Sequence, residues 1–506
     1  MQKLTAIPLA GLALLVAACG TTVPQDQRAA GAQSAAGGGL SEVGGGTGAS
    51  QPLPGAGGST LAGQAPGSSG ASVGGTTGTT GDAVGGSAGS SKTSGARGPA
   101  AIARGVTSTT VTIGAAIPTG TEAVGQTFGI SGAGSVSEKA MWDAVIADVN
   151  KAGGVLGRKL VLYNHSVDFA SYVANPEKTY GEVCADFKDD HKVYAAFLYI
   201  GDPSLRSCFA SMGTPMILYG AFTTMPEAAY AANGANYLYG PDSITNERLA
   251  QLFVQSLVAN SFMSTWDTTN GGPGIEPVKL GVIHADTPDQ NNLYAAYARE
   301  LAKYGRSFSD TITYSGSASD AVAATQSAVL KMKVDGITHV FGASAFFLRD
   351  AESQHYRPRY AYLPGLGALG AANSPAEQLK GAQTVGWAPM QDVNQPQDPG
   401  PTPGAARCTA VMRAAGLTSA NRQDIKLMYA VCDAVYSFQE ALTAGQQANV
   451  AGLRRGYEAL GMGVRTALTF NGLFGPGRHY GVNSVRDMGY DSACACLKYT
   501  SRTNRS

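Results

Sequence analysis

Six histidines are the residues on which acid–base or nucleophilic chemistry would most readily depend. A serine or cysteine nucleophile needs a histidine base, and usually a carboxylate that orients the histidine. The chain contains no GxSxG and no HExxH motif, and none of its histidines lies in a recognisable catalytic pattern. We therefore expect a protein that is not an enzyme and has no catalytic residues. The histidines are His165, His191, His284, His339, His355 and His479.

Glycine-rich segments and net charge point away from nucleotides and nucleic acids. Residues 271–274 (GGPG) do not lead from a strand into a helix, so they predict a loop and not a dinucleotide cradle. Residues 129–134 have GxxGxG spacing, which is a weak pattern in a chain with 67 glycines. The formal net charge is zero, which gives no reason to expect nucleic acid as a partner. We expect no cofactor.

Seven cysteines are present, and six of them follow Cys19. An even number in an exported chain indicates disulfides, although six cysteines allow several pairings. No CxxC motif or nearby histidine accompanies them, so we expect no metal site. Cys494 and Cys496 are so close that a bridge between them would be strained, and their pairing stays open. The natural local pairs are Cys184 with Cys208 and Cys408 with Cys432.

The first 18 residues have the features of a secretory signal. Lys3 is followed by an apolar run over residues 9–18, and this run is too short to span a bilayer, which takes about 20 residues. Residues 16–20 (VAACG) resemble the lipobox of bacterial lipoproteins, in which the cysteine becomes a lipidated N-terminus. The prediction is a signal peptide over 1–18 and lipidation of Cys19. An ordinary secretory signal with a chance cysteine is the alternative.

Residues 19–104 are predicted to be the lipidated cysteine and a disordered tether. The segment is rich in glycine, serine, alanine and threonine and has almost no aromatic residue. Such a composition buries too little apolar surface to offset the entropy of ordering. A flexible coil of this length spans roughly 50 Å, which suits a tether between the membrane and the folded part of the chain.

The remaining part alternates strand-like and helix-like segments, which is typical of parallel sheets with right-handed crossovers. The series restarts after the loop near Gly271, so two α/β lobes are predicted. A TIM barrel would also alternate, but this loop and a helical block over 405–460 argue against eight even units. Strands are expected at 111–117, 159–164, 193–200, 215–219, 279–284, 308–314 and 338–341, and helices at 136–151, 176–188, 204–212, 245–259, 290–304 and 320–334.

Two motifs carry a family resemblance. Residues 111–120 (VTIGAAIPTG) resemble the opening strand and ligand loop of type I periplasmic binding proteins, most closely the Leu/Ile/Val receptors of ABC importers. Residues 148–160 (DVNKAGGVLGRKL), followed by Asp168, resemble that family's first helix and second strand. The similarity is good over 109–241, patchy to Trp387 and weak beyond.

The resemblance implies an α/β fold of two Rossmann-like lobes with parallel sheets joined by hinge crossovers. Cys184 and Cys208 fall where the Leu/Ile/Val receptors have a disulfide in the first lobe. The glycines of the second motif have a structural explanation, because Gly153 and Gly154 suit the left-handed end of a helix. That motif therefore indicates the fold and not the ligand. The expected division is 105–242 and 382–469 for the first lobe, 243–381 and 470–500 for the second, and 501–506 for a tail.

Ligands of open parallel sheets bind beyond the carboxyl ends of the strands. In the first lobe these loops contain Thr119, Asp202, Ser204, Ala221 and Thr223. The resemblance implies that the loops after the third and fourth strands hold a ligand carboxylate, which falls to Ser204, Ala221 and Thr223. Alternatively, Asp202 and Ser204 only cap the following helix.

In the second lobe the corresponding candidates are Asp286, Ser344 and Phe346. The family places an acidic residue here for the ligand ammonium, but residues 342–347 (GASAFF) contain none. Asp202 or Asp286 would then have to be the counter-ion of an α-amino acid. Aromatic residues such as Phe346 would instead line a site for an apolar ligand, or belong to the core.

These observations together predict a lipid-anchored solute-binding protein on the extracytoplasmic face of the cell membrane. Its two lobes would close over a small polar or amino-acid-like ligand and deliver it to an ABC permease. We expect a monomer. The alternative is a surface sensor or scaffold of the same fold that takes no part in transport.

Overall fold

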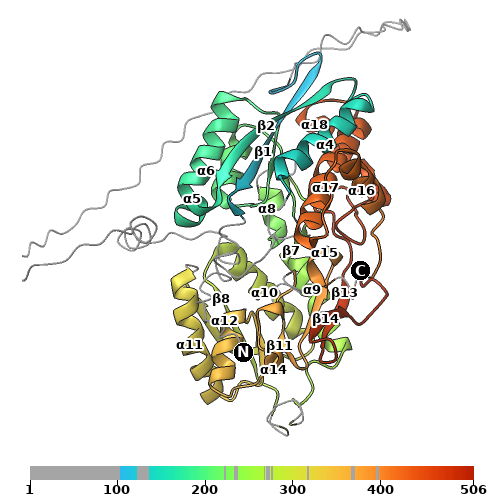
Figure 1. The fold of residues 1–506 in the computed structure, drawn as a ribbon. Coiled ribbons are helices and arrows are strands. Elements are labelled where there is room, and N and C mark those ends of the chain that lie inside the picture. The colour runs from blue at the N-terminus through green and yellow to red at the C-terminus, as the bar shows by residue number, and fades with distance from the viewer. Residues whose placement is uncertain are drawn as a thin grey trace, which may run out of the picture. The chain divides into compact units, whose positions relative to one another are not determined.

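The computed structural model describes residues 103–121, 136–220, 224–232, 237–266, 268, 274, 277–315, 318–365, 371–394, 397 and 399–506. Cys19 and the predicted tether therefore lie outside the described residues, apart from the last two tether positions. The described part contains two large sheets with helices around them (Figure 1). Among its helices, none is both long and apolar enough to cross a bilayer.

The first sheet has five parallel strands in the order β2-β1-β3-β4-β6. Every residue of β3 is buried, and its side chains alternate between two cores. Ala195 and Phe197 face one hydrophobic cluster, while Ala196 and Leu198 face the other, as the two-residue period of a strand requires. The strands are β1 (Thr110–Thr119), β2 (Lys159–Asp168), β3 (Ala195–Leu198), β4 (Met216–Leu218) and β6 (Leu238–Tyr239).

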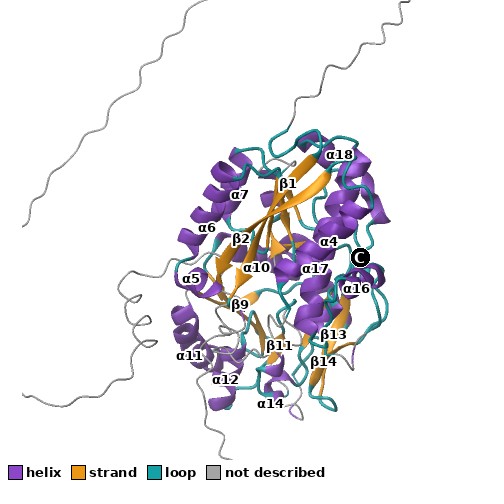
Figure 2. Ribbon diagram, turned by 45° about the horizontal axis from the view of Figure 1, so that its top comes forward, coloured by secondary structure: helices purple, strands orange, loops and turns teal. Residues whose placement is uncertain are grey.

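Helices cover both faces of this sheet. One face carries α6 and α7, and the other carries α4 with the C-terminal helices α16 to α18, which return to this lobe from much later in the chain (Figure 2). The helices are α4 (Glu138–Lys151), α5 (Phe169–Ala174), α6 (Pro176–Ala185), η2 (Asp186–Asp190), α7 (Pro203–Ser211), α8 (Glu227–Ala232), α16 (Ala405–Ala414), α17 (Arg422–Gly445), α18 (Val450–Leu460) and η5 (Gly461–Gly463).

The second sheet has seven strands in the order β14-β13-β12-β11-β10-β8-β9. Strands β8 to β12 are parallel, and β13 and β14 add an antiparallel edge. The strands are β8 (Leu280–Ala285), β9 (Phe308–Tyr314), β10 (His339–Phe341), β11 (Arg359–Ala361), β12 (Gln383–Gly386), β13 (Arg486–Asp491) and β14 (Cys496–Tyr499). The associated helices are α9 (Asn246–Ala259), α10 (Pro288–Ala302), α11 (Ala318–Val334), α12 (Ala345–Ser353), α14 (Ala376–Leu379) and α15 (Pro389–Asp392).

One expected lobe boundary is wrong. The division at 381/382 assigns residues 383–386 to the first lobe, but β12 pairs with β11 and β13 in the second sheet. The chain therefore returns toward the first lobe only after Gly386. Local sequence patterns do not reveal this, because the pairing of Gln383 with Gly489 joins strands about 100 residues apart.

Three chain crossovers connect the sheets, and backbone hydrogen bonds join them to one another. The first follows β6, the second follows β12, and the third precedes β13. Gly240 N donates to His479 O at 2.9 Å, and Gly481 N donates to Gly240 O at 2.8 Å. Phe470 N donates to Trp387 O at 3.2 Å. The crossovers thus form a hydrogen-bonded set, together with the small sheet of β5 (Thr224–Met225) and β7 (Ile244–Thr245).

The predicted helix end at Gly153 and Gly154 is confirmed. Gly154 has φ +74°, and its N–H donates to Val149 O at 2.9 Å, which closes the end of α4. A Cβ at this position would lie 2.0 Å from Arg158 O, so only glycine fits without moving the backbone. The motif therefore sets the turn from α4 into β2.

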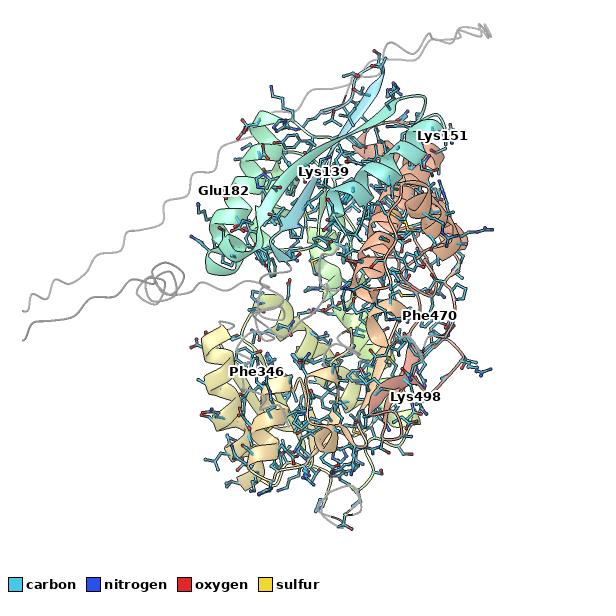
Figure 3. All side chains as sticks on the ribbon, viewed as in Figure 1. Lys139, Lys151, Glu182, Phe346, Phe470 and Lys498 are labelled. Carbon is cyan, nitrogen blue, oxygen red and sulfur yellow. A yellow bond between two sulfur atoms is a disulfide. The ribbon has the colours of Figure 1, made fainter. Side chains whose placement is uncertain are left out.

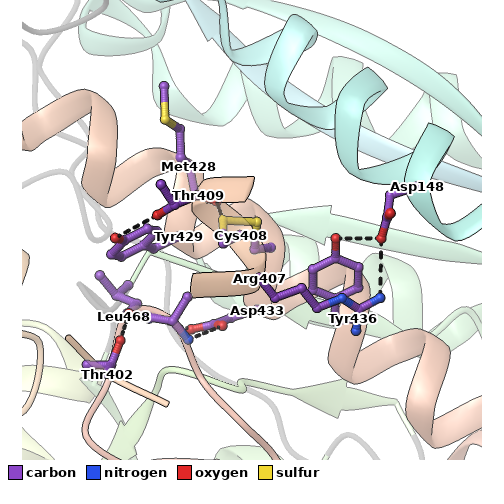
Figure 4. Close-up of a disulfide and its surroundings, with 12 residues drawn as sticks. Asp148, Thr402, Arg407, Cys408, Thr409, Met428, Tyr429, Asp433, Tyr436 and Leu468 are labelled. Carbon is purple, nitrogen blue, oxygen red and sulfur yellow. Dashed lines mark hydrogen bonds and ion pairs between the residues drawn. A yellow bond between two sulfur atoms is a disulfide. The ribbon is translucent and has the colours of Figure 1, made fainter. Parts of the chain in front are cut away.

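Both predicted local disulfides are present, Cys184–Cys208 and Cys408–Cys432. The second joins α16 to α17, and the neighbouring Arg407 pairs with Asp148 of α4 at 3.3 Å (Figure 4). Cys494 and Cys496, whose pairing the sequence left open, are bonded to each other in the turn between β13 and β14.

Candidate functional site

Thr119 is the last residue of β1 and lies at the carboxyl edge of the first sheet. Its side chain is exposed, and its hydroxyl donates to Val167 O at 3.3 Å. The next residue, Gly120, has φ +70° and turns the chain away from the strand. Thr119 is therefore available at the edge where ligands of parallel sheets bind, but its hydroxyl already has an acceptor.

Asp202 and Ser204 form a helix cap after β3. Asp202 is 5 % exposed and is the N-cap of α7. Its Oδ1 accepts hydrogen bonds from the Ser204 backbone N–H at 2.7 Å and from the Ser204 hydroxyl at 2.6 Å. The capping alternative is thus observed. A carboxylate already lies at the positive end of α7, which opposes the binding of a second carboxylate there.

The loop after β4 contains Ala221 and Thr223, which lie outside the described residues. Its first residue, Gly220, has φ +110°, and its N–H donates to Asp242 Oδ2 at 2.6 Å. Asp242 belongs to the first crossover and is fully buried. This bond ties the beginning of the predicted ligand loop to the segment that connects the two lobes.

In the second lobe, Asp286 follows β8 and is exposed. Asn291 Nδ2 donates to its Oδ1 at 2.7 Å. Ser344 is the N-cap of α12 and accepts from Phe347 N at 3.4 Å. Phe346, labelled in Figure 3, is 8 % exposed, and the guanidinium of Arg349 lies 4.8 Å from its ring centroid. All three candidates lie at the carboxyl edge of the second sheet.

Helices α7 and α10 connect candidate residues of the first lobe with candidate residues of the second. Each helix begins at the carboxyl edge of its sheet. Arg206 of α7 pairs with Asp289 of α10 at 3.3 Å, and Asn246 Nδ2 donates to Asp289 O at 2.8 Å. Arg206 lies two residues after Ser204, and Asp289 lies three residues after Asp286. The contact therefore places the Asp202–Ser204 cap and the Asp286 turn on facing edges of the two lobes.

A buried acid next to the first-lobe edge was not predicted from the sequence. Glu138, in the first turn of α4, accepts hydrogen bonds from Tyr219 OH at 2.9 Å and from Trp142 Nε1 at 3.2 Å. Burial raises the pKa of Glu138 to about 7, although hydrogen bonds from Tyr199, Tyr219 and Trp142 oppose that shift. Tyr199 and Tyr219 directly follow β3 and β4. The buried carboxyl group of Glu138 therefore contacts the residues at which both candidate loops begin.

The second crossover contains two further side chains that sequence reasoning missed, Trp387 and Gln391. They are 2 % and 5 % exposed. Gln391 Nε2 donates to the carbonyl of Gly365, which follows β11. No sequence motif marks these residues, because their position depends on which strands are neighbours in the second sheet.

No protein-family model and no curated protein matches this chain. Solved structures do match. A substrate-binding protein of an ABC transporter from Desulfitobacterium hafniense, in complex with Leu, has 17% identity and a TM-score of 0.50, over 77% of this chain and 99% of that one. A type 1 periplasmic binding protein from Bordetella pertussis Tohama I has 15% identity and a TM-score of 0.51, over 78% and 98%.

A third solved structure, an ABC-transporter solute-binding protein from R. palustris in complex with 4-hydroxybenzoate, has 11% identity and a TM-score of 0.54, over 78% of this chain and 97% of that one. These likenesses concern the fold. The chain has the two-lobed α/β fold of the type I periplasmic binding proteins, as predicted from residues 111–120 and 148–160.

Proposed function

We propose that this protein is a lipid-anchored, extracytoplasmic solute-binding protein that captures a small polar or amino-acid-like ligand between its lobes. One observation carries the proposal. The carboxyl edges of two parallel sheets face each other across the Arg206–Asp289 contact, and such edges are where α/β folds bind small molecules. Delivery of the ligand to an ABC permease is part of the proposal.

The structural neighbours support a carboxylate as one part of the ligand. Leu and 4-hydroxybenzoate, which two of them hold, share a carboxylate but not an ammonium group. In this chain, Thr119, Ser204 and Thr223 are the proposed polar contacts of the first lobe, and Ala221 leaves the space for the ligand. Asp286 and Ser344 are the proposed polar contacts of the second lobe, Phe346 is a proposed apolar wall of the site, and Asp202 is a cap or counter-ion.

Closure of the lobes would couple the ligand to transport. A ligand stabilises the closed form only by the difference between its affinities for the closed and open forms. The three hydrogen-bonded crossovers are the segments about which such a hinge motion would occur. A permease that binds the closed form would then receive only the loaded protein.

Ligand capture is tested by native mass spectrometry of the protein purified from its own membrane, followed by identification of any released molecule. The expected result is a small adduct that is lost on denaturation. Uptake of that compound should fall in cells that lack the gene and return with the wild-type gene. Binding without any effect on uptake would favour the sensor alternative, and the absence of a bound or bindable small molecule would contradict the proposal.

Anchoring is tested separately with Cys19→Ser. Metabolic labelling with a fatty-acid analogue should label the wild-type chain and not the variant. The variant should remain an uncleaved precursor or appear in the medium. Equal labelling of the two chains would contradict lipidation of Cys19.

A further inference from the structure

Trp387 and Gln391 each bury a polar atom that has no hydrogen-bond partner. Trp387 Nε1 is a donor, and Gln391 Oε1 is an acceptor. Both side chains are at least 95 % buried. Buried polar atoms in folded proteins are paired in the great majority of cases. One donor and two acceptors are left over in this short segment, because Asp392 Oδ1, next to Gln391, has no partner either. Their concentration in one segment indicates a missing partner.

The two side chains share one place at the edge of the second sheet. Trp387 directly follows β12, and Gly365 lies four residues after β11. A Cβ built on Gly365 would lie 3.4 Å from Trp387 Cη2 and 3.7 Å from Gln391 Nε2. All three residues thus meet beyond the carboxyl ends of β11 and β12, at the sheet edge where ligands bind in this class of fold.

The chemistry of the two atoms restricts the missing partner. An indole N–H can only donate, and an amide oxygen can only accept. A carboxylate would accept from Trp387 but could not donate to Gln391. An ammonium group would donate to Gln391 but could not accept from Trp387. A hydroxyl or a carboxamide can do both at once.

We propose that Trp387 and Gln391 are specificity-determining residues that bind an uncharged hydroxyl or carboxamide of the ligand. This inference rests on the proposed ligand capture and narrows the substrate class. The ligand would carry a neutral group that both donates and accepts a hydrogen bond, at the end that enters the second lobe. Trp387 also presents an apolar ring, so this group would be attached to an apolar or aromatic body.

The inference is tested by calorimetric titration with matched pairs of compounds. One member of each pair carries a hydroxyl that the other lacks: 4-hydroxybenzoate has it in place of a ring hydrogen of benzoate, and threonine has it in place of a methyl group of valine. In any pair that binds, the hydroxylated member should bind about tenfold to a hundredfold more tightly. Trp387→Phe and Gln391→Leu should reduce this preference to about twofold, because each removes one of the two hydrogen bonds.

Trp266→Phe is the matched control. The Nε1 of Trp266 donates to Arg357 O at 2.8 Å, and this side chain is 5 % exposed. The control variant therefore loses an indole N–H hydrogen bond whose acceptor is a protein atom. It should keep the preference for the hydroxylated compound. It should also lose more apo stability than Trp387→Phe, which removes a donor without a partner.

Two results would overturn the inference when a pair binds: equal affinity of its members, or a preference that persists in both variants. If no pair binds, ligand capture is still tested by the native mass spectrometry described above, and a crystal structure of the purified protein decides on Trp387 and Gln391. An organic hydroxyl or amide between Trp387 Nε1 and Gln391 Oε1 would support the assignment. A water molecule alone, or pairing of both atoms with protein atoms, would refute it.

Discussion

The guanidinium of Arg206 lies 3.3 Å from a carboxylate oxygen of Asp289, and this ion pair joins α7 of the first lobe to α10 of the second. The two side chains are 8 % and 21 % exposed, so solvent screens the pair only partly. Arg206 Nη1 also contacts Met225 Sδ at 2.8 Å, which fixes the guanidinium against β5. The pair is therefore suited to hold the facing sheet edges near each other.

A double-mutant cycle of Arg206→Met and Asp289→Asn tests this role. We expect a coupling of about 1–2 kcal/mol in the free energy of unfolding, because the pair is charged and mostly buried. Small-angle scattering should show a larger radius of gyration for either single variant of the apo protein. The exposed pair Lys139–Asp143, at 2.7 Å, is the control and should show a coupling below about 0.5 kcal/mol. An unchanged radius of gyration would mean that the pair does not restrain the lobes.

Glu138 predicts a specific pH dependence of stability. Burial raises its pKa from 4.5 to about 7. Between these values the folded chain binds more protons than the unfolded chain, so the contribution of Glu138 to stability falls as the pH rises. The full difference amounts to about 3 kcal/mol and is complete above the folded pKa.

Urea unfolding of wild type and Glu138→Gln at pH 5 and pH 8 measures this effect. Glutamine keeps an oxygen that accepts from Tyr219 and Trp142 but does not titrate. The stability of the variant relative to wild type should rise by about 2.5 kcal/mol between the two pH values, because part of the full difference is already present at pH 5. Because the variant is compared with wild type, the other buried titratable groups, such as Asp392 and Lys426, cancel. A difference that is the same at both pH values would contradict the shift.

The disulfides should differ in their contribution to stability. Cys408–Cys432 closes a loop with a sequence separation of 24, whereas Cys494–Cys496 has a separation of 2. The entropy that a disulfide removes from the unfolded chain grows with loop length. Replacing both Cys408 and Cys432 by alanine should cost about 3 kcal/mol, and replacing both Cys494 and Cys496 less than about 2 kcal/mol. Chemical denaturation without reductant measures both, and equal losses would count against this account.

Most strands and helices that build the two parallel sheets could be predicted from local patterns, because each strand and helix has its own hydrophobic period. The predicted strand 111–117 became β1, and the predicted helix 245–259 became α9. The antiparallel strands β13 and β14 were missed. Their sequences are short and mixed in polarity, and their place in the sheet depends on pairing with β12, about 100 residues earlier.

The candidate site could be predicted only in part, for a related reason. The loops after β1, β3, β8 and β10 follow from the strand pattern, since ligand loops come directly after the strands. Glu138 joins Tyr219 across 81 residues, and no motif marks that contact. The absence of a partner for Trp387 Nε1 is a property of its surroundings, and only the folded structure reveals it.

The last prediction separates the two roles considered for Asp202. This carboxylate caps α7 and cancels part of the positive end of the helix. Asparagine is an equally good cap, so Asp202→Asn should leave stability nearly unchanged and remove only the charge. If the ligand presents a carboxylate to this edge, the variant should bind it about threefold to tenfold more tightly. If Asp202 is the counter-ion of a ligand ammonium, the variant should instead bind the ligand more weakly.

Calorimetric titration with the co-purifying ligand distinguishes these outcomes. Asp335→Asn is the matched control: Asp335 is exposed, lies just after α11 and pairs with Lys331 at 2.6 Å. It makes the same change in net charge away from the carboxyl edges and should leave the affinity unchanged. Salt should reduce the effect at Asp202, because screening weakens the interaction between the carboxylate and a charged ligand. An affinity that is the same in wild type and Asp202→Asn at low salt would leave Asp202 with the capping role alone.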